Sequence, residues 1–173
     1  MSLPSTRVDS RLVVGLGSRD RGDDAVGPEV AARVAARVGT PLTRAGVRVV
    51  EHEDPTALID LWADAGLAVV VDAVRSGQPP GTLVVLEAGA DGSPFPAGPW
   101  AVTGRGGTHA LGLAAVVELA RTLGALPGRL VVVGIEVGGV EHGAPLSPEV
   151  AAAVPGAVDA VVTLLEQEPG GAR

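Results

Sequence analysis

The chain has 173 residues, of which 46% are hydrophobic, and this length suits one domain with a substantial core. It contains no cysteine and all thirteen of its basic residues are arginines, so disulfides, thiolate metal sites and cysteine or lysine nucleophiles are excluded. The net charge of −7 and the scarcity of aromatic residues argue against a nucleic-acid surface, and no apolar run approaches the roughly 20 residues of a membrane span.

In chain order, the apolar patterns predict a strand at 12–14, a helix at 24–38, a strand at 47–50, a helix at 55–65, strands at 67–71 and 83–86, a helix at 109–123, a strand at 130–133 and a final helix after Ser147. The helix at 24–38 places four valines on one face: Val26, Val30, Val34 and Val38. The helix at 55–65 turns three apolar side chains inward: Leu58, Leu61 and Trp62. Ser147 is expected to cap the final helix, and Pro155 to kink or break it.

Strands that alternate with helices indicate an α/β fold, with a mostly parallel sheet of about five strands and helices on both faces. The connection between 71 and 83 has about a dozen residues, includes two prolines and shows no helical pattern, so we expect the strand at 83–86 to run antiparallel. We expect one domain over residues 1–173 with flexible ends at about 1–10 and 167–173, and a cytoplasmic protein with no nucleic-acid or membrane partner.

A glycine-rich turn, GLGSRDRGDDAVGPEV, follows the strand at 12–14. Gly17 and Gly22 have the glycine spacing of a phosphate loop, but Asp23 and Asp24 stand where that motif needs a lysine and a hydroxyl. The dinucleotide fingerprint fails as well, because its third glycine position holds Asp20. Two acids at the start of a helix suit a cation better than a phosphate. The alternative is that one of them simply caps the helix.

Asp72 ends the fully apolar strand at 67–71, in the stretch VVVDAV. A carboxylate in such a place needs a partner or a cation, although a turn-capping role is the alternative. The carboxyl ends of parallel strands share one edge of an open α/β sheet, which is where such folds bind ligands. Asp24 and Asp72 should therefore meet there.

His109 opens the predicted helix at 109–123, and the chain must climb back to the same edge before that helix descends. Two carboxylates and one imidazole would make a metal site with open positions for a substrate group or water. A lone histidine at a helix start is otherwise a surface residue. We expect His52 and His142 to be solvated loop residues, although His142 follows the last strand and could face the same cleft. Glu136, Glu141 and His142 should rim the cleft, without an assigned role.

Four motifs in order, GLGSRDRGDDAVGPEV, VVVDAV, THALGL and GIEVGGVEHGAPLSPEV, together resemble the hydrogenase maturation endopeptidases from about residue 12 to 165. The resemblance implies a three-layer α/β/α sandwich with one antiparallel edge strand. It also implies a protease that removes the C-terminal extension of a nickel–iron hydrogenase large-subunit precursor once nickel has been inserted.

By motif, the family's metal and catalytic positions fall on Asp24, Asp72 and His109. The resemblance implies that nickel arrives with the precursor, and that another divalent metal such as zinc can occupy the site of the isolated protein. The implied partner is the hydrogenase large-subunit precursor, and we expect a monomer.

Two positions depart from the family pattern. Ser18 stands where the family usually has asparagine, and residues 51–56, EHEDPT, replace a glycine-rich loop that is connected with substrate choice. Two alternatives therefore stay open. One is a non-catalytic metal- or precursor-binding factor of the same fold, and the other is a receiver-like magnesium-binding signalling domain. The second is disfavoured because the chain has no lysine to follow its last strand.

Overall fold

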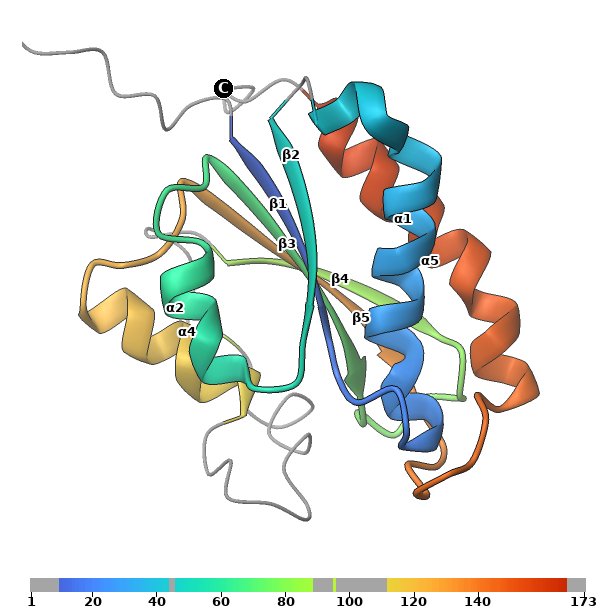
Figure 1. Ribbon diagram of the computed structural model, residues 1–173. Helices are drawn as coiled ribbons and strands as arrows, with labels where there is room; N and C mark the ends of the chain where they lie inside the picture. The colour runs from blue at the N-terminus through green and yellow to red at the C-terminus, as the bar shows by residue number, and fades with distance from the viewer. Residues whose placement is uncertain (1–9, 44–45, 89–94, 96–111, 168–173) are drawn as a thin grey trace, which may run out of the picture.

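The computed structural model describes residues 10–43, 46–88, 95 and 112–167. Five strands form one sheet with the order β2-β1-β3-β5-β4 (Figure 1). Their bounds are β1 Arg11–Leu16, β2 Val47–His52, β3 Leu67–Val74, β4 Leu83–Ala88 and β5 Arg129–Glu136. The α-helices are α1 Val26–Thr43, α2 Leu58–Leu61, α4 Leu113–Thr122 and α5 Pro148–Glu166, and short 3₁₀ turns at Gly22–Ala25 and Pro55–Ala57 precede α1 and α2.

The first three strands and β5 are mutually parallel, and β4 runs antiparallel to β5 at the edge of the sheet. All eight residues of β3 are buried, as expected for a central strand that is covered on both faces. The predicted antiparallel edge strand is confirmed. The link between β3 and β4 is too short to carry a helix back across the sheet, so the chain turns and pairs in the opposite direction.

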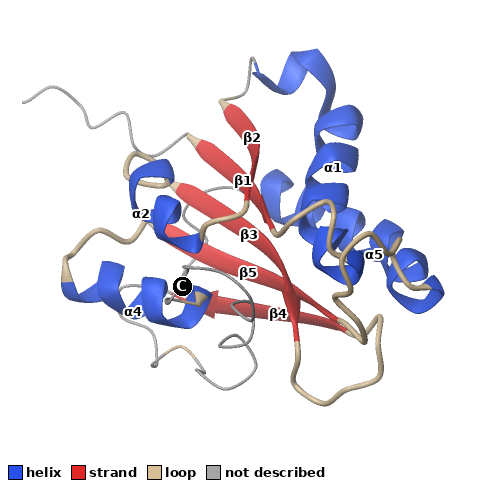
Figure 2. Ribbon diagram, turned by 60° about the horizontal axis from the view of Figure 1, so that its bottom comes forward, coloured by secondary structure: helices blue, strands red, loops and turns tan. Residues whose placement is uncertain are grey.

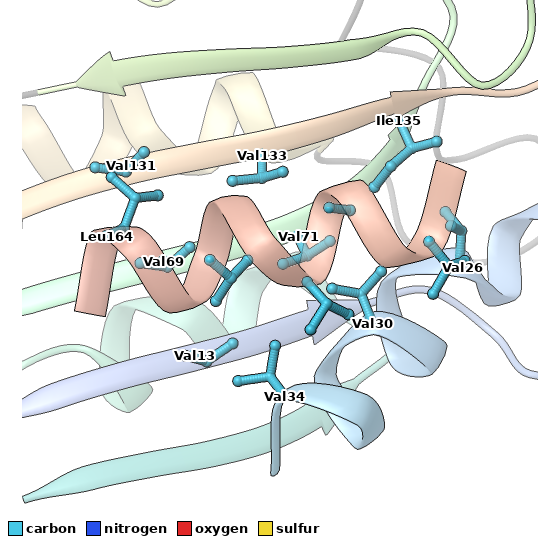
Figure 3. Packing of buried hydrophobic residues seen from close by; sticks show 14 of the residues in the cluster. Val13, Val26, Val30, Val34, Val69, Val71, Val131, Val133, Ile135 and Leu164 are labelled. Carbon is cyan, nitrogen blue, oxygen red and sulfur yellow. The ribbon is translucent and has the colours of Figure 1, made fainter. Parts of the chain in front are cut away.

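Helices cover both faces of the sheet, and the predicted three-layer α/β/α architecture is confirmed (Figure 2). One core lies between the sheet and the pair α1 and α5, and the other lies under α2 and α4. Figure 3 shows Val26, Val30 and Val34 of α1 among the valines of β1, β3 and β5, and all three are fully buried. Burial of each such side chain stabilises the fold by roughly 1.5–3 kcal/mol relative to an exposed one. The predicted valine face therefore holds α1 to the sheet.

Gly27 sets the close approach of α1 to the ends of β1 and β3. A Cβ atom on Gly27 would lie 2.1 Å from the Leu16 carbonyl oxygen and 2.7 Å from that of Val71. These contacts are too short for any side chain, so glycine at this position lets the start of α1 rest directly on the carboxyl edge of the sheet.

The helices differ locally from the predicted ones. The α2 helix ends at Leu61, although Trp62 is still fully buried and its indole Nε1 donates to the Ala125 carbonyl oxygen at 2.9 Å. The helix α4 begins at Leu113, and the predicted turn from 109 to 111 lies outside the described residues, as do most of the predicted flexible ends.

Pro155 does not break α5, which continues from Pro148 to Glu166. Pro155 lies on the exposed face, while Val154 and Val158 beside it are buried against the core. Packing of the apolar stripe therefore outweighs the backbone hydrogen bond that the proline removes. Among the described helices, α5 alone is long and apolar enough for a membrane span, and here its apolar stripe packs on the sheet and α1.

Candidate active site

The β1–α1 turn brings Asp24 to the carboxyl edge of the sheet. Asp24 lies in the 3₁₀ turn at Gly22–Ala25, and its Oδ2 accepts a hydrogen bond from the Ser18 backbone N–H at 2.9 Å. Gly17, between the strand and Ser18, has a φ of 129°, and a Cβ atom there would lie 2.0 Å from the Asp24 carbonyl oxygen. The glycine is needed for the turn to fold back onto Asp24. The contact from Ser18 is made by the main chain, so the departure from asparagine at this position leaves it intact.

Asp72 lies in β3 at the same edge and is only 1% exposed. Its Oδ2 has no hydrogen-bond partner among the described residues. Burial raises the pKa of Asp72 well above its ordinary value, the nearby Asp24 carboxylate raises it further, and the Ala73 backbone N–H opposes the shift. Asp72 is therefore a buried carboxyl group with an unused oxygen and a charged neighbour, which favours binding of a proton or a cation.

The pKa of Asp24 is also raised, although less strongly. Burial is the largest cause and Glu53 adds to it, whereas the Ser18 N–H and the Arg21 guanidinium act in the opposite direction. Asp24 is partly exposed and remains accessible from solvent, whereas Asp72 is buried. Asp24 and Asp72 therefore lie close together at one edge of the sheet, as predicted.

Asp23 is adjacent in sequence but belongs to a different environment. It is 1% exposed, and its carboxylate accepts four hydrogen bonds from the segment that follows β5. The alternative that one of the two acids caps the helix is wrong for the described contacts, because Asp23 accepts from Gly138, Gly139 and Ser147 and Asp24 accepts from Ser18, all outside the helix. Asp23 joins two loops and Asp24 faces Asp72. Residue type and spacing do not distinguish the two acids, and only the family motif favoured Asp24.

Glu136, expected to rim the cleft, is instead buried at the end of β5, with 3% of its surface exposed. Its carboxylate accepts hydrogen bonds from the backbone N–H groups of Ser76 and Gly77 and from the Ser76 hydroxyl, at 2.7–3.0 Å. It therefore fixes the turn that follows β3, four residues beyond Asp72. Sequence reasoning missed this role because the donors lie some sixty residues away.

The end of β2 and the turn that follows it are held by polar contacts. His52 is partly buried, and its Nδ1 lies 3.0 Å from the Asp54 backbone nitrogen and 3.1 Å from the Asp54 carbonyl oxygen. Glu51 pairs with Arg19 of the β1–α1 turn through two contacts of 2.6 and 2.8 Å. The expected solvated loop is correct for His142, which is exposed, but His52 takes part in the turn.

His109, the third predicted site residue, lies outside the described residues. Within the described part of the chain, no three acidic or histidine side chains form a group able to hold a metal ion. The site therefore consists here of Asp24 and Asp72. The unpartnered oxygen of Asp72 and the hard oxygen donors of both carboxylates fit a divalent cation that still needs ligands from elsewhere.

The protein is an open α/β/α sandwich with two carboxyl groups of raised pKa at the carboxyl edge of its sheet. This arrangement is typical of α/β proteins that bind or hydrolyse a ligand at that edge. The family model of the hydrogenase maturation proteases (HycI) matches residues 53–164, which is more than half of the chain. The chain belongs to the hydrogenase maturation protease family.

Solved structures agree with this assignment. The hydrogenase 2 maturation peptidase from Thaumarchaeota archaeon SCGC_AB-539-E09 is 28% identical, with a TM-score of 0.63, and the match covers 91% of this chain and 98% of that one. The hydrogenase maturating endopeptidase HybD from Escherichia coli is 23% identical (TM-score 0.65; 90% and 91% covered). The [NiFe] hydrogenase maturation protease HycI from Thermococcus kodakarensis KOD1 is 22% identical (TM-score 0.65; 92% and 94% covered), and these last two similarities concern the fold. No curated protein sequence matches the chain significantly.

Proposed function

We propose that this protein is a cytoplasmic endopeptidase that removes the C-terminal extension of a nickel–iron hydrogenase large-subunit precursor after nickel insertion. The observation that carries the proposal is Asp72, fully buried with an oxygen that has no partner, beside a second acid at the ligand-binding edge of the sheet. A folded protein keeps such an uncompensated group mainly where function uses it.

In this proposal the nickel belongs to the precursor, and Asp24, Asp72 and His109 are the residues that bind it. Carboxylate and imidazole ligands suit nickel, and the resulting contact would hold the precursor only when it carries metal. The protease would then cut only metal-loaded precursor, because ligation of the metal places the peptide bond next to the carboxyl groups.

Peptide hydrolysis requires a group that takes a proton from the attacking water and a group that gives a proton to the leaving amine. A carboxyl group with a raised pKa can do both in turn, and Asp24 combines a raised pKa with access from solvent. Water adds to the carbonyl carbon while its proton passes to the carboxylate. The C–N bond then breaks as that proton moves to the amine nitrogen.

The test uses a hydrogenase large-subunit precursor prepared with and without nickel, and the mass of the precursor after incubation. We expect the wild-type protein to shorten the nickel-loaded precursor alone, and Asp72→Asn and His109→Ala to leave it intact. Asp60→Asn is the matched control, because it removes an exposed carboxylate on α2, away from Asp24 and Asp72. Unimpaired cleavage by Asp72→Asn would contradict the proposed site. A precursor that is bound but never shortened would favour a non-catalytic binding factor instead.

A further inference from the structure

The β1–α1 turn, which carries Asp24, is bonded to the β5–α5 loop as one unit. Three backbone hydrogen bonds of 2.7–3.1 Å join the two segments: Gly143 N–H to Asp20 O, Asp23 N–H to Gly139 O, and Gly22 N–H to Ala144 O. Gly22 has a φ of 54°, and a Cβ atom there would lie 3.2–3.3 Å from backbone atoms of Gly139 and Glu141. The two segments therefore touch along their main chains.

Asp23 adds the side-chain contacts across this junction. Its Oδ2 accepts the N–H groups of Gly138 and Gly139, both at 3.2 Å, and the Ser147 hydroxyl at 3.0 Å. Its Oδ1 accepts the Ser147 N–H at 2.6 Å. Ser147 was expected to cap α5, and it occupies the N-cap position, but its hydroxyl turns to Asp23 instead. All four donors come from one loop and meet one buried carboxylate.

Asp24 itself has few such constraints. It lies in the four-residue 3₁₀ turn Gly22–Ala25, and two glycines with positive φ, Gly17 and Gly22, precede it. Among the described residues, its carboxylate accepts one hydrogen bond, from the Ser18 N–H. A short turn that is entered through two such glycines has little conformational preference of its own. The direction of the Asp24 carboxylate is therefore set by what anchors the turn.

We infer that Asp23 is a positioning residue: through the β5–α5 loop it holds the 3₁₀ turn in the one arrangement that points Asp24 at Asp72. This inference rests on the proposed function for its catalytic consequence. Asparagine cannot replace Asp23, because one of its two polar atoms is an NH₂ group. In either orientation that group would oppose a backbone N–H that now donates to the carboxylate.

The experiment compares Asp23→Asn, Ser147→Ala and the control Trp62→Phe, each at a temperature well below its own unfolding midpoint. Ser147→Ala removes only the hydroxyl donor, so it keeps the turn testable if Asp23→Asn folds poorly. Trp62→Phe removes one buried hydrogen bond under α2 and α4, on the face of the sheet away from α1. It therefore lowers stability without touching the turn.

We expect Asp23→Asn to lower kcat for the nickel-loaded precursor roughly 10–100-fold with little change in KM, the size of effect seen when a supporting residue lets a reactive group shift. Ser147→Ala should act in the same direction and less strongly, and Trp62→Phe should leave kcat within about twofold. Amide hydrogen exchange over residues 18–25 should become faster in Asp23→Asn and stay unchanged in Trp62→Phe.

Wild-type kcat in both Asp23→Asn and Ser147→Ala overturns the inference and leaves the proposed function standing. Equal loss of kcat in Trp62→Phe also overturns it, because a general loss of stability would then explain the effect. If the wild-type protein cleaves no precursor, the proposed function fails, and hydrogen exchange alone tests whether Asp23 positions the turn. Faster exchange confined to residues 18–25 and the β5–α5 loop supports the positioning role of Asp23, and unchanged exchange there overturns it.

Discussion

Asp23 and Asp72 should respond in opposite ways when each is changed to asparagine, although both are buried to the same extent, with 1% of their surface exposed. The change removes a charge and keeps the shape of the side chain. Asp72 has an oxygen without a partner, so its carboxylate is destabilising where it stands. Asp23 satisfies four donors, so its carboxylate stabilises the fold.

The size of each effect follows from these contacts. A buried polar group without a partner costs about 1–3 kcal/mol. In Asp72→Asn, one polar atom of the new amide still lacks a hydrogen-bond partner, so only part of this cost is removed. We therefore expect the substitution to raise the free energy of unfolding by about 1–2 kcal/mol. For a chain of this length that corresponds to an increase in Tm of about 2–8 °C. Asp23→Asn leaves at least one backbone N–H opposed, and should lower the free energy of unfolding by about 1–3 kcal/mol.

The increase in the free energy of unfolding that we expect for Asp72→Asn should depend on pH. The pKa of Asp72 in the folded protein lies well above its ordinary value of 3.8, so the folded state binds more protons than the unfolded state between the two values. The wild-type protein therefore loses stability as the pH rises above about 4, and the variant does not share this loss. The advantage of Asp72→Asn should be smallest near pH 4 and largest above the folded-state pKa.

Urea unfolding followed by circular dichroism at several pH values measures both variants against the wild type. A variant Asp72→Asn that is less stable than the wild type at pH 8 would refute the reasoning, since the Asp72 carboxylate would then be held by stabilising contacts. An Asp23→Asn variant of unchanged stability would refute the reasoning that the Asp23 carboxylate stabilises the fold.

Three further outcomes test the framework that positions the site. Gly27→Ala should lower the free energy of unfolding by about 1–3 kcal/mol or more, because its methyl group would meet the Leu16 carbonyl at 2.1 Å; urea unfolding measures this. Pro155→Ala should raise Tm, since it restores a helical hydrogen bond on an exposed face, where a mid-helix proline costs about 3 kcal/mol; a thermal melt decides. Glu51→Gln should change stability by less than about 1 kcal/mol, because its pair with Arg19 is half exposed, and the change should shrink further in high salt.

Each of these outcomes has a clear contradiction. An unaltered stability in Gly27→Ala would mean that α1 can move away from the sheet edge without loss. A lower Tm in Pro155→Ala would mean that α5 depends on the proline. A large loss in Glu51→Gln, persisting in high salt, would mean that the end of β2 is held to the β1–α1 turn by more than a surface ion pair.

The order of strands and helices and the class of fold follow from local patterns in the sequence. The apolar runs have the length of strands, and the valines of α1 recur at helical spacing. Both patterns indicate which faces must be buried, and a sheet covered by helices buries them. The link before β4 was too short for a parallel crossover, so its direction was also predictable. Asp24 and Asp72 could be placed at one edge because each follows or ends a parallel strand.

The role of each buried acid, in contrast, depends on contacts between distant segments of the chain. Asp23 and Asp24 are neighbours of the same type, and their roles differ because the donors that select Asp23 lie 115 to 124 residues further along the chain. Glu136 likewise meets donors sixty residues before it. Helix α5 keeps its course through Pro155 because its apolar stripe packs on the core. Periodicity and spacing report local conformation and burial, whereas hydrogen-bond partners are chosen only when distant segments of the chain come together.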